Sequence, residues 1–136
     1  MTALSVLDLM MVGEGKTFAD TLNDAATLAK HVEQHGYKRY WIAEHHDLPG
    51  IASSATTLLI QHLAAATSTL RVGAGGIMMP NHSPLVVAEH FGTLDTLFPN
   101  RIDLGIGRAP GSAGPAIRAL RGDASERDFQ RDIKQL

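Results

Sequence analysis

Residues 40–46 read YWIAEHH and join a strand pattern to a polar end. The first four residues form an apolar run with aromatic and β-branched side chains, which is typical of a parallel strand covered on both faces. Glu44, His45 and His46 then follow directly. Because polar side chains have no structural purpose inside such a strand, its carboxyl end is where we expect chemistry.

The same layout occurs three more times in the chain. Apolar runs at residues 4–11, 70–79 and 102–106 each lead into segments rich in glycine or proline, and helical patterns lie between the runs. This alternation predicts parallel strands joined by right-handed crossovers. In such sheets and barrels, ligands bind at the carboxyl ends of the strands. Every polar cluster considered below falls at such an end.

The helices have recognisable boundaries. Thr17 is expected to cap a first helix that runs to His35, and Pro84 is expected at the first position of a third helix that begins after Ser83 and stops before Pro99. The second helix, residues 53–67, is apolar nearly all round. We therefore expect it to be covered by the sheet on one side and by a partner subunit on another.

Four strands and about four helices are half of what a closed (β/α)8 barrel of about 250 residues requires. We predict an α/β fold, the N-terminal half of a TIM-type barrel, with residues 1–136 as one partial domain that holds strands one to four. A small, open doubly wound sheet is the alternative. Residues 116–120 are expected to be helical, and residues 121–134 part helix and part loop.

Composition excludes several classes of function. The chain has 136 residues, 44% of them hydrophobic, with a net charge of −2 and no cysteine. Its 12 Lys and Arg residues form no basic stripe, which argues against nucleic acid as a partner. The absence of a long apolar segment or a signal sequence leads us to expect a cytoplasmic protein and no membrane. Without cysteine, disulfides, thiolate catalysis and cysteine-based metal sites are excluded.

Glu44, His45 and His46 are adjacent in the chain. In an extended segment their side chains alternate, so Glu44 and His46 are expected on one face and His45 on the other. Three interpretations stay open: a metal site, a general acid or base, and hydrogen bonds that only fix the loop.

Gly73, Gly75 and Gly76 interrupt the third strand pattern. Glycine weakens a strand unless a ligand or another backbone must come close to it. Close packing of a helix across the sheet is one explanation. A flat ring pressed against bare backbone is the other, and the pair Gly75–Gly76 at the strand's outlet favours the ring.

Arg108 leaves the end of the fourth strand. The glycine spacing in residues 105–111 does not match the dinucleotide-binding fingerprint. A guanidinium at this position can bind a phosphate through two hydrogen bonds, while an ion pair with Asp103 or Glu44 is the alternative.

The chain has further polar candidates. Asn81 and His82 are expected on the same face as Arg108, and turn formation with capping of the following helix is the structural alternative. His31 and His35, one turn apart on the first helix, are expected at the surface rather than on a metal, and His90 is expected to be structural.

The chain resembles the N-terminal part of the bacterial luciferase-like monooxygenases, flavin-dependent enzymes built on a (β/α)8 barrel. The resemblance extends over nearly the whole chain and is carried by six segments: LSVLDL at 4–9, WIAEHH at 41–46, IASSAT at 51–56, RVGAGG at 71–76, PNHSPLVVAE at 80–89 and RIDLGIGRAPG at 101–111.

The resemblance implies roles for individual residues. His45 corresponds to the family's catalytic histidine, and Arg108 to an arginine at the FMN phosphate. Gly75 and Gly76 correspond to a cis peptide bond beside the flavin ring, and Glu44 belongs to the same cofactor-binding group. The helices at 53–67 and 83–97 correspond to a homodimer interface.

The resemblance also implies an activity. Reduced FMN, supplied by a separate flavin reductase, uses O2 to oxygenate a small organic substrate, with deazaflavin as the alternative cofactor. The competing hypothesis is a catalytically silent half barrel that serves as an oligomerisation module or is a truncation product. A metal-dependent hydrolase using His45, His46 and His82 is a third, and no metal is included in the predicted site.

Overall fold

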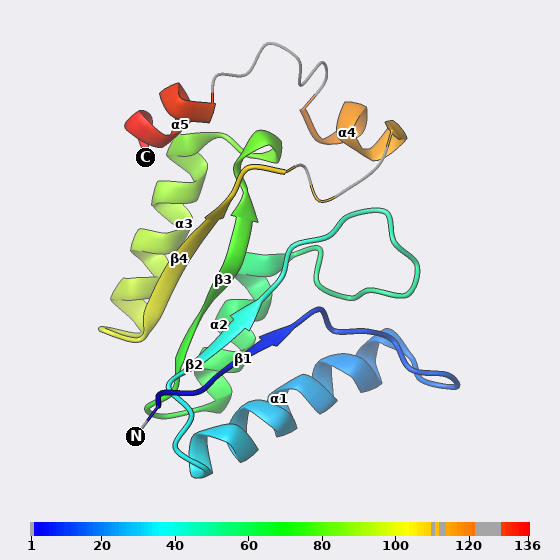
Figure 1. Cartoon of the computed structure of the whole chain (residues 1–136), viewed down its shortest axis with the longest axis vertical. Coiled ribbons are helices and arrows are strands. Elements are labelled where there is room, and N and C mark those ends of the chain that lie inside the picture. Colours follow the sequence, from blue (N-terminus) through cyan, green and yellow to red (C-terminus); the bar gives the residue numbers. More distant parts are fainter. Residues whose placement is uncertain (1, 110, 112–113, 122–128) are drawn as a thin grey trace.

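The computed structural model describes residues 2–109, 111, 114–121 and 129–136. Its centre is a parallel sheet in which the strand order in space follows the order in the chain (Figure 1). The strands are β1 (Ser5–Asp8), β2 (Arg39–Ile42), β3 (Arg71–Met78) and β4 (Ile102–Gly107). This is the predicted α/β fold of four parallel strands alternating with helices.

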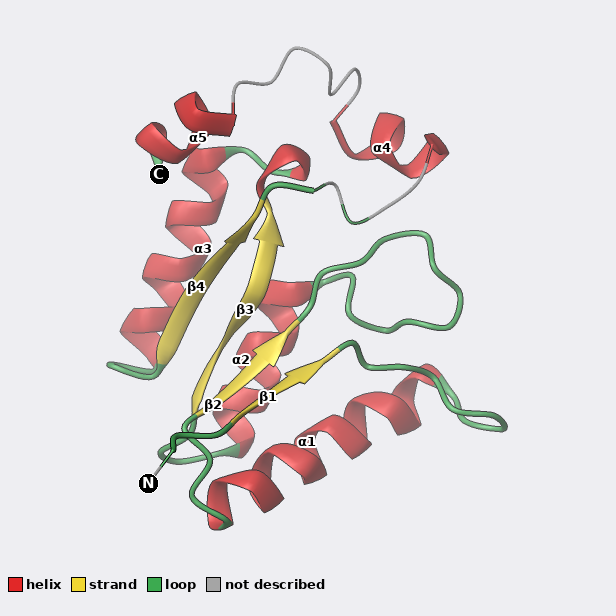
Figure 2. Ribbon diagram, viewed as in Figure 1, coloured by secondary structure: helices red, strands yellow, loops and turns green. Residues whose placement is uncertain are grey.

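Helices cover one face of the sheet and leave the other face open (Figure 2). The three long helices that alternate with the strands are α1 (Phe18–Gln34), α2 (Thr56–Ala66) and α3 (Pro84–Leu97). Beyond the sheet come α4 (Gly114–Arg121) and α5 (Phe129–Gln135), and a 3-10 turn, η1 (Met79–Asn81), links β3 to α3. Within the described part of the chain, no helix combines the length and apolarity that crossing a bilayer needs.

Local sequence signals explain the helix boundaries. Thr17 caps α1 as predicted: its hydroxyl accepts from the Asp20 N–H at 3.1 Å, and Asp20 accepts in return from the Thr17 N–H at 2.9 Å. Pro84 is the first residue of α3, also as predicted. The second helix begins at Thr56 rather than Ser53, because residues 53–55 belong to the loop that leads into it.

The core lies between the sheet and the helices. Alternate residues of the central strands point into it and are buried, as the period-two pattern of a strand requires. They pack against small residues of α1 and larger ones of α2 and α3. The principal members are Ala25, Ala29, Tyr40, Ile42, Leu59, Ile60, Leu63, Val72, Ala74, Ile77, Val87, Phe91 and Leu94.

The opposite face and both edges of the sheet have no cover in the described chain. Leu7 on β1 is 59% exposed on this open face, where it lies close to Trp41 and Gly75. In the described sheet, β1 pairs only with β2, and β4 pairs only with β3. A half barrel has this form, since closure would require further strands on both edges.

Two predicted strand boundaries differ from the structure. The first strand ends at Asp8 rather than Met11, because the Met10 N–H turns back to donate to Asp8 Oδ1 at 2.7 Å and Met10 adopts φ = 51°. The second begins at Arg39, one residue before the predicted run. The tail contains α5, as expected in part, but residues 122–128 lie outside the described chain.

Candidate functional site

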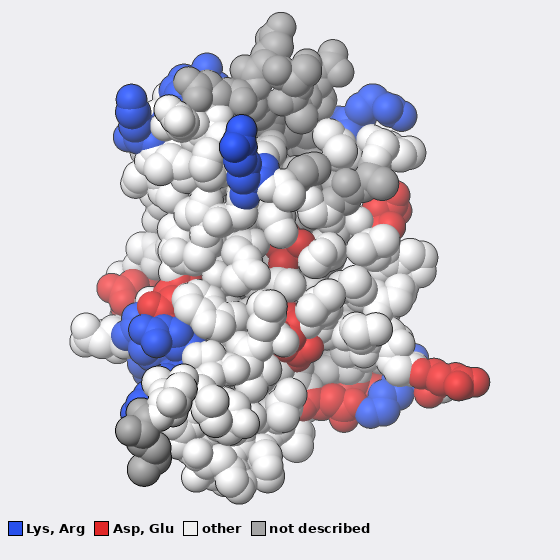
Figure 3. All heavy atoms as spheres, in the orientation of Figure 1, with Lys and Arg blue, Asp and Glu red and all other residues white. Residues whose placement is uncertain are grey.

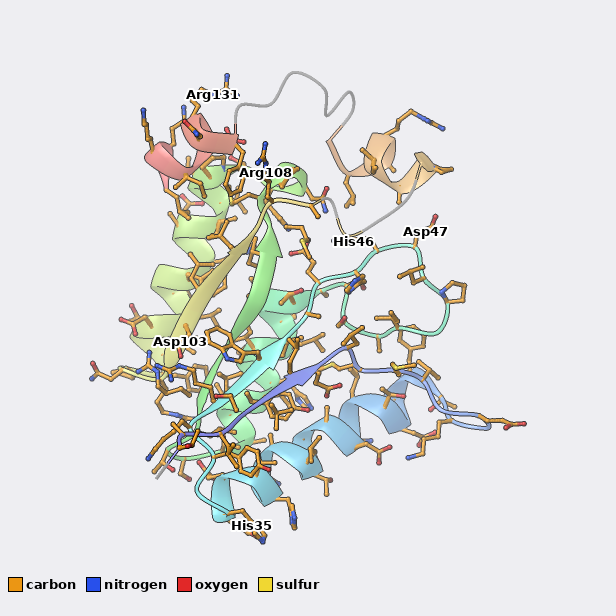
Figure 4. The ribbon with its side chains drawn as sticks, viewed as in Figure 1. His35, His46, Asp47, Asp103, Arg108 and Arg131 are labelled. Atoms are coloured by element: carbon orange, nitrogen blue, oxygen red, sulfur yellow. The ribbon has the colours of Figure 1, made fainter. Side chains whose placement is uncertain are left out.

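Loops after three strands meet at the carboxyl end of the sheet. The His46 N–H donates to Gly111 O at 3.0 Å, which joins the loop after β2 to the loop after β4. Gly111 adopts φ = 61°, and a side chain there would approach Glu44 O. Figure 4 shows His46 and Arg108 at this end of the sheet and Asp103 at the other. The predicted polar segments therefore share one end.

Glu44 is completely buried and accepts from three donors. Its Oε1 accepts from His46 Nε2 and from His82 Nε2, each at 2.7 Å. Its Oε2 accepts from the Met78 N–H at 3.0 Å. The donors come from the loop after β2, from the segment between η1 and α3, and from the end of β3. A single carboxylate thus connects three elements.

The electrostatics of Glu44 depend on these bonds. Burial by itself raises the pKa of the Glu44 carboxyl, but hydrogen bonds from His82, His46 and the Met78 N–H outweigh burial and leave the pKa below its usual value. Glu44 is therefore ionised at neutral pH. As predicted from the alternation of an extended chain, Glu44 and His46 lie on the same side.

Glu44, His46 and His82 are also of the right type for metal ligands, with their ligand atoms within 4.8 Å of one another. The predicted set of three histidines does not form among the described residues, because Glu44 takes the place of His45. Both N···O distances are 2.7 Å. Two ligands of a tetrahedral metal ion, each at about 2.0–2.1 Å, stand roughly 3.3 Å apart. The geometry is that of direct hydrogen bonds.

His45 lies apart from this cluster. Its Nδ1 is buried and has no hydrogen-bond partner among the described residues. Buried polar atoms in proteins are almost always bonded, so an unsatisfied one calls for a specific explanation. A ligand or water that bonds to Nδ1 would supply it.

The glycines of β3 have two different environments. A side chain at Gly73 would overlap Asp103 O, and one at Gly76 would come within 2.9 Å of Gly105 O. These two glycines are explained by the close approach of β4, not by a helix crossing the sheet. Two residues of β3, Gly75 and Gly76, bulge opposite the single residue Gly105 of β4.

Gly75 differs because it is exposed on the open face. Its nearest side-chain neighbours are Trp41 and Leu7, which come from β2 and β1. The peptide bond between Gly75 and Gly76 is cis, in agreement with what the resemblance implies. Bare backbone flanked by two apolar side chains offers a surface suited to a flat ring.

Arg108 is exposed and has no ion pair or hydrogen bond with any described residue. The alternative prediction of an ion pair with Asp103 or Glu44 is wrong. Asp103 lies at the amino end of the sheet, where it binds Arg71 Nε at 2.8 Å and Arg39 Nε at 3.0 Å. In Figure 3, which has the orientation of Figure 4, blue and red spheres lie side by side near the position at which Figure 4 labels Asp103.

Sequence reasoning placed His82 at this end of the sheet but did not predict its bond to Glu44. The structural alternative, capping of α3, is wrong for His82: Ser83 occupies the cap position and makes no side-chain bond there, while the ring of His82 reaches Glu44. Its location just after β3, the strand beside β2, was the signal that could have indicated this contact. His31 and His35 lie at the surface as predicted, with ring centroids 4.2 Å apart.

Two cavities lie on the helical side of the site. One, of about 90 Å³, is lined by both Glu44 and His82, together with Ser54, Thr56, Thr57 and His90. The other, of about 230 Å³, is a groove between α2 and α3 whose apolar lining comes from Leu58, Leu94 and Leu97. His90 lines both cavities.

The luciferase-like monooxygenase family model matches residues 2–131. The chain belongs to this family. A luciferase-like monooxygenase of Escherichia coli strain K12 is 53% identical over 138 residues, which include 98% of this chain and 41% of that protein. The chain spans about two fifths of the length of the curated relatives it matches.

Solved structures of other proteins share the fold. The structure of apo-MsnO8 matches with a TM-score of 0.93 and 46% identity and covers all of this chain and 41% of that one. The oxygenating constituent of 3,6-diketocamphane monooxygenase from Pseudomonas putida, a type II Baeyer-Villiger monooxygenase in complex with FMN, matches with a TM-score of 0.78 and 20% identity over 36% of its length. At 20% identity, the similarity to this structure shows a shared fold and nothing more. Four parallel strands alternating with helices therefore form part of a luciferase-like barrel.

Proposed function

We propose that this chain is the N-terminal part of a flavin-dependent monooxygenase and that it binds reduced FMN at the carboxyl end of its sheet. The observation that carries the proposal is that three groups lie at that end: the buried His45 Nδ1 and the exposed Arg108, neither of which has a partner among the described residues, and the exposed Gly75. Each has the chemistry that one part of a flavin requires.

The three groups receive separate roles. The Arg108 guanidinium binds the FMN phosphate, because it donates several hydrogen bonds in a planar fork. The Gly75–Gly76 backbone lies against the ring. His45 holds or moves a proton at Nδ1. Glu44 has no exposed surface and acts by holding the loops that present the other groups.

When bound, reduced FMN supplies the reaction with O2, which the side chains of this chain cannot perform. The substrate is a small organic molecule, and a separate flavin reductase supplies the reduced cofactor. Oxygenation needs a site from which water is excluded. The open face of the sheet then requires cover from the remaining strands of a barrel, so we assign residues 1–136 to a partial barrel domain. We place the protein in the cytoplasm.

We also propose that two copies associate through α2 and α3. Leu58 is 66% exposed, Leu85 65% and Leu97 57%, and the groove between the helices is apolar. Exposed apolar surface of this kind is typical of protein interfaces. Sedimentation should give a dimer for the wild type and a monomer for Leu58→Lys; equal masses for the two would contradict this interface.

Titration of the chain with FMN, followed by flavin fluorescence, tests the cofactor site. We expect saturable quenching and binding weaker by about 10- to 150-fold for Arg108→Ala, since a hydrogen bond to a charged group contributes about 1.5–3 kcal/mol. Arg39→Ala, an arginine substitution at the opposite end of the sheet, is the matched control and should leave affinity unchanged. Parallel titration with a deazaflavin decides between the two cofactors.

The silent half barrel remains the second candidate, favoured by the two unpaired edges of the sheet and by its open face. The two functions predict different outcomes. Absence of flavin binding, with no difference between Arg108→Ala and Arg39→Ala, would support the silent module. Oxidation of reduced FMN at a rate that depends on His45 would eliminate it.

A further inference from the structure

Two histidines share one carboxylate oxygen beside the proposed flavin site. An ionised carboxylate only accepts hydrogen bonds, so both rings must donate to Glu44 Oε1. His46 and His82 therefore each carry a proton on Nε2. In the neutral ring the other nitrogen, Nδ1, is then free of its proton and can accept one.

This arrangement resembles the pairing of a carboxylate with a histidine in general acid–base catalysis, where the carboxylate fixes the ring and balances the charge it acquires. Here the carboxylate is fully buried, whereas the side chains of His46 and His82 are 15% and 30% exposed. Protons can thus reach the rings although the carboxylate is shielded from water.

A small cavity adjoins the cluster. The titratable groups that face Glu44 are His46 from its own loop and His82 from the segment before α3, and His90 of α3 lies across the shared cavity. At about 90 Å³ that cavity can hold several water molecules, since one needs roughly 10–15 Å³. Ser54, Thr56 and Thr57 are among its lining residues.

We propose that His46 and His82, positioned by Glu44, store protons for the flavin site, and that His82 exchanges them with water in the cavity that it lines. The inference rests on the proposed function. A proton accepted at Nδ1 converts a ring to a cation, whose charge Glu44 balances. The same proton later leaves from Nδ1 to the group that needs it, so each cycle ends with the starting charges and requires no oxidant or reductant.

Proton NMR of the ¹⁵N-histidine-labelled chain tests the geometry without any flavin. The imidazole N–H protons of His46 and His82 should give resolved downfield signals, because their bonds to a buried carboxylate slow exchange. Glu44→Ala should abolish both signals. His31 and His35, exposed on α1, should give none, and their substitution by glutamine should leave the spectrum of the cluster unchanged.

The function is tested by the pH dependence of the oxidation of reduced FMN by O2. Glutamine at position 82 retains an N–H donor for Glu44 but cannot take up a proton. We therefore expect the pH profile of the oxidation rate to differ between His82→Gln and the wild type, while FMN affinity stays within twofold. His46→Gln should alter the profile in the same way, and His31→Gln should not.

The possible outcomes separate the two proposals. Normal FMN binding with an identical pH profile in His82→Gln would overturn the proton-storing role alone. Failure to bind FMN, with the downfield signals intact, would overturn the flavin proposal and leave the cluster as a structural link, which also ends the proton role. Loss of the signals on addition of micromolar Zn²⁺ would instead identify a metal site and overturn the inference.

Discussion

Glu44 and Asp103 are two carboxylates at opposite ends of the same sheet, and each is bound by two basic side chains. Glu44 is fully buried and accepts from His46 and His82. The side chain of Asp103 is 19% exposed and accepts from Arg39 and Arg71. The environments, not the acids themselves, determine what the two clusters can do.

The difference lies in the donors. An arginine stays charged throughout the physiological range, so the Asp103 cluster keeps one net positive charge at any pH in that range. Hydrogen bonding to Arg71 lowers the pKa of Asp103 against the opposing effect of burial. Histidine can bind or release a proton where arginine cannot, and this is why we propose the proton-storing role for the Glu44 cluster and not for the Asp103 cluster. The amino end is therefore suited to structure, and the carboxyl end to chemistry.

Among the substitutions that test this difference, Glu44→Ala should have the largest effect on stability. Three donors lose their acceptor in a buried site, and the free energy of unfolding should fall by roughly 3 kcal/mol. Urea unfolding measures the change. Glu44→Gln keeps an acceptor oxygen and should cost about half as much; equal losses for the two variants would refute the hydrogen-bond explanation.

The pH dependence of stability tests the role of the Glu44 charge. The folded-state pKa of Glu44 is lower than the ordinary value of 4.5, so its stabilising contribution is complete above that pH and disappears as pH falls through the folded-state value. The difference in unfolding free energy between wild type and Glu44→Ala should therefore shrink below pH 4.5. A difference that stays constant down to pH 2 would show that Glu44 does not act through its charge.

Gly73→Ala tests the contact between β3 and β4 beside Asp103. The added methyl group would overlap Asp103 O, and we expect a loss of about 2 kcal/mol in unfolding free energy. Gly92→Ala on α3 is the matched control, because nothing lies within 4 Å of its side-chain position. That change should stabilise the helix by up to about 1 kcal/mol; destabilisation by both variants would argue against the contact.

Asp103→Ala should have a smaller effect, about 1 kcal/mol, because its arginine partners are partly exposed to solvent. Removal of the carboxylate leaves Arg39 and Arg71 to repel each other. The loss should decrease in high salt, which screens exposed charges. Thermal unfolding at low and high ionic strength measures this, and an effect independent of salt would rule out repulsion as its cause.

Arg108→Ala should have the smallest effect on stability, within about 0.5 kcal/mol, since Arg108 is exposed and has no partner among the described residues. Chemical unfolding of the variant without flavin checks this. A larger loss would mean that Arg108 stabilises the fold and would weaken its assignment to the FMN phosphate.

The sequence by itself determined the order of strands and helices, because apolar runs, capping residues, the proline that begins α3 and the proline that follows it are local signals. It also placed Glu44 and His46 on one side of the chain, since side chains in an extended segment alternate. Family membership follows equally from the order of short motifs such as WIAEHH and RVGAGG, which needs no coordinates.

Only the tertiary structure decided which groups meet. The bond between His82 and Glu44 joins residues 38 positions apart, and no local pattern encodes it. The separation of Asp103 from Arg108 likewise depends on their location at opposite ends of β4, although the two are five positions apart in the chain. Local sequence fixes the direction of a backbone, but contacts between distant side chains follow from how strands pair and helices pack.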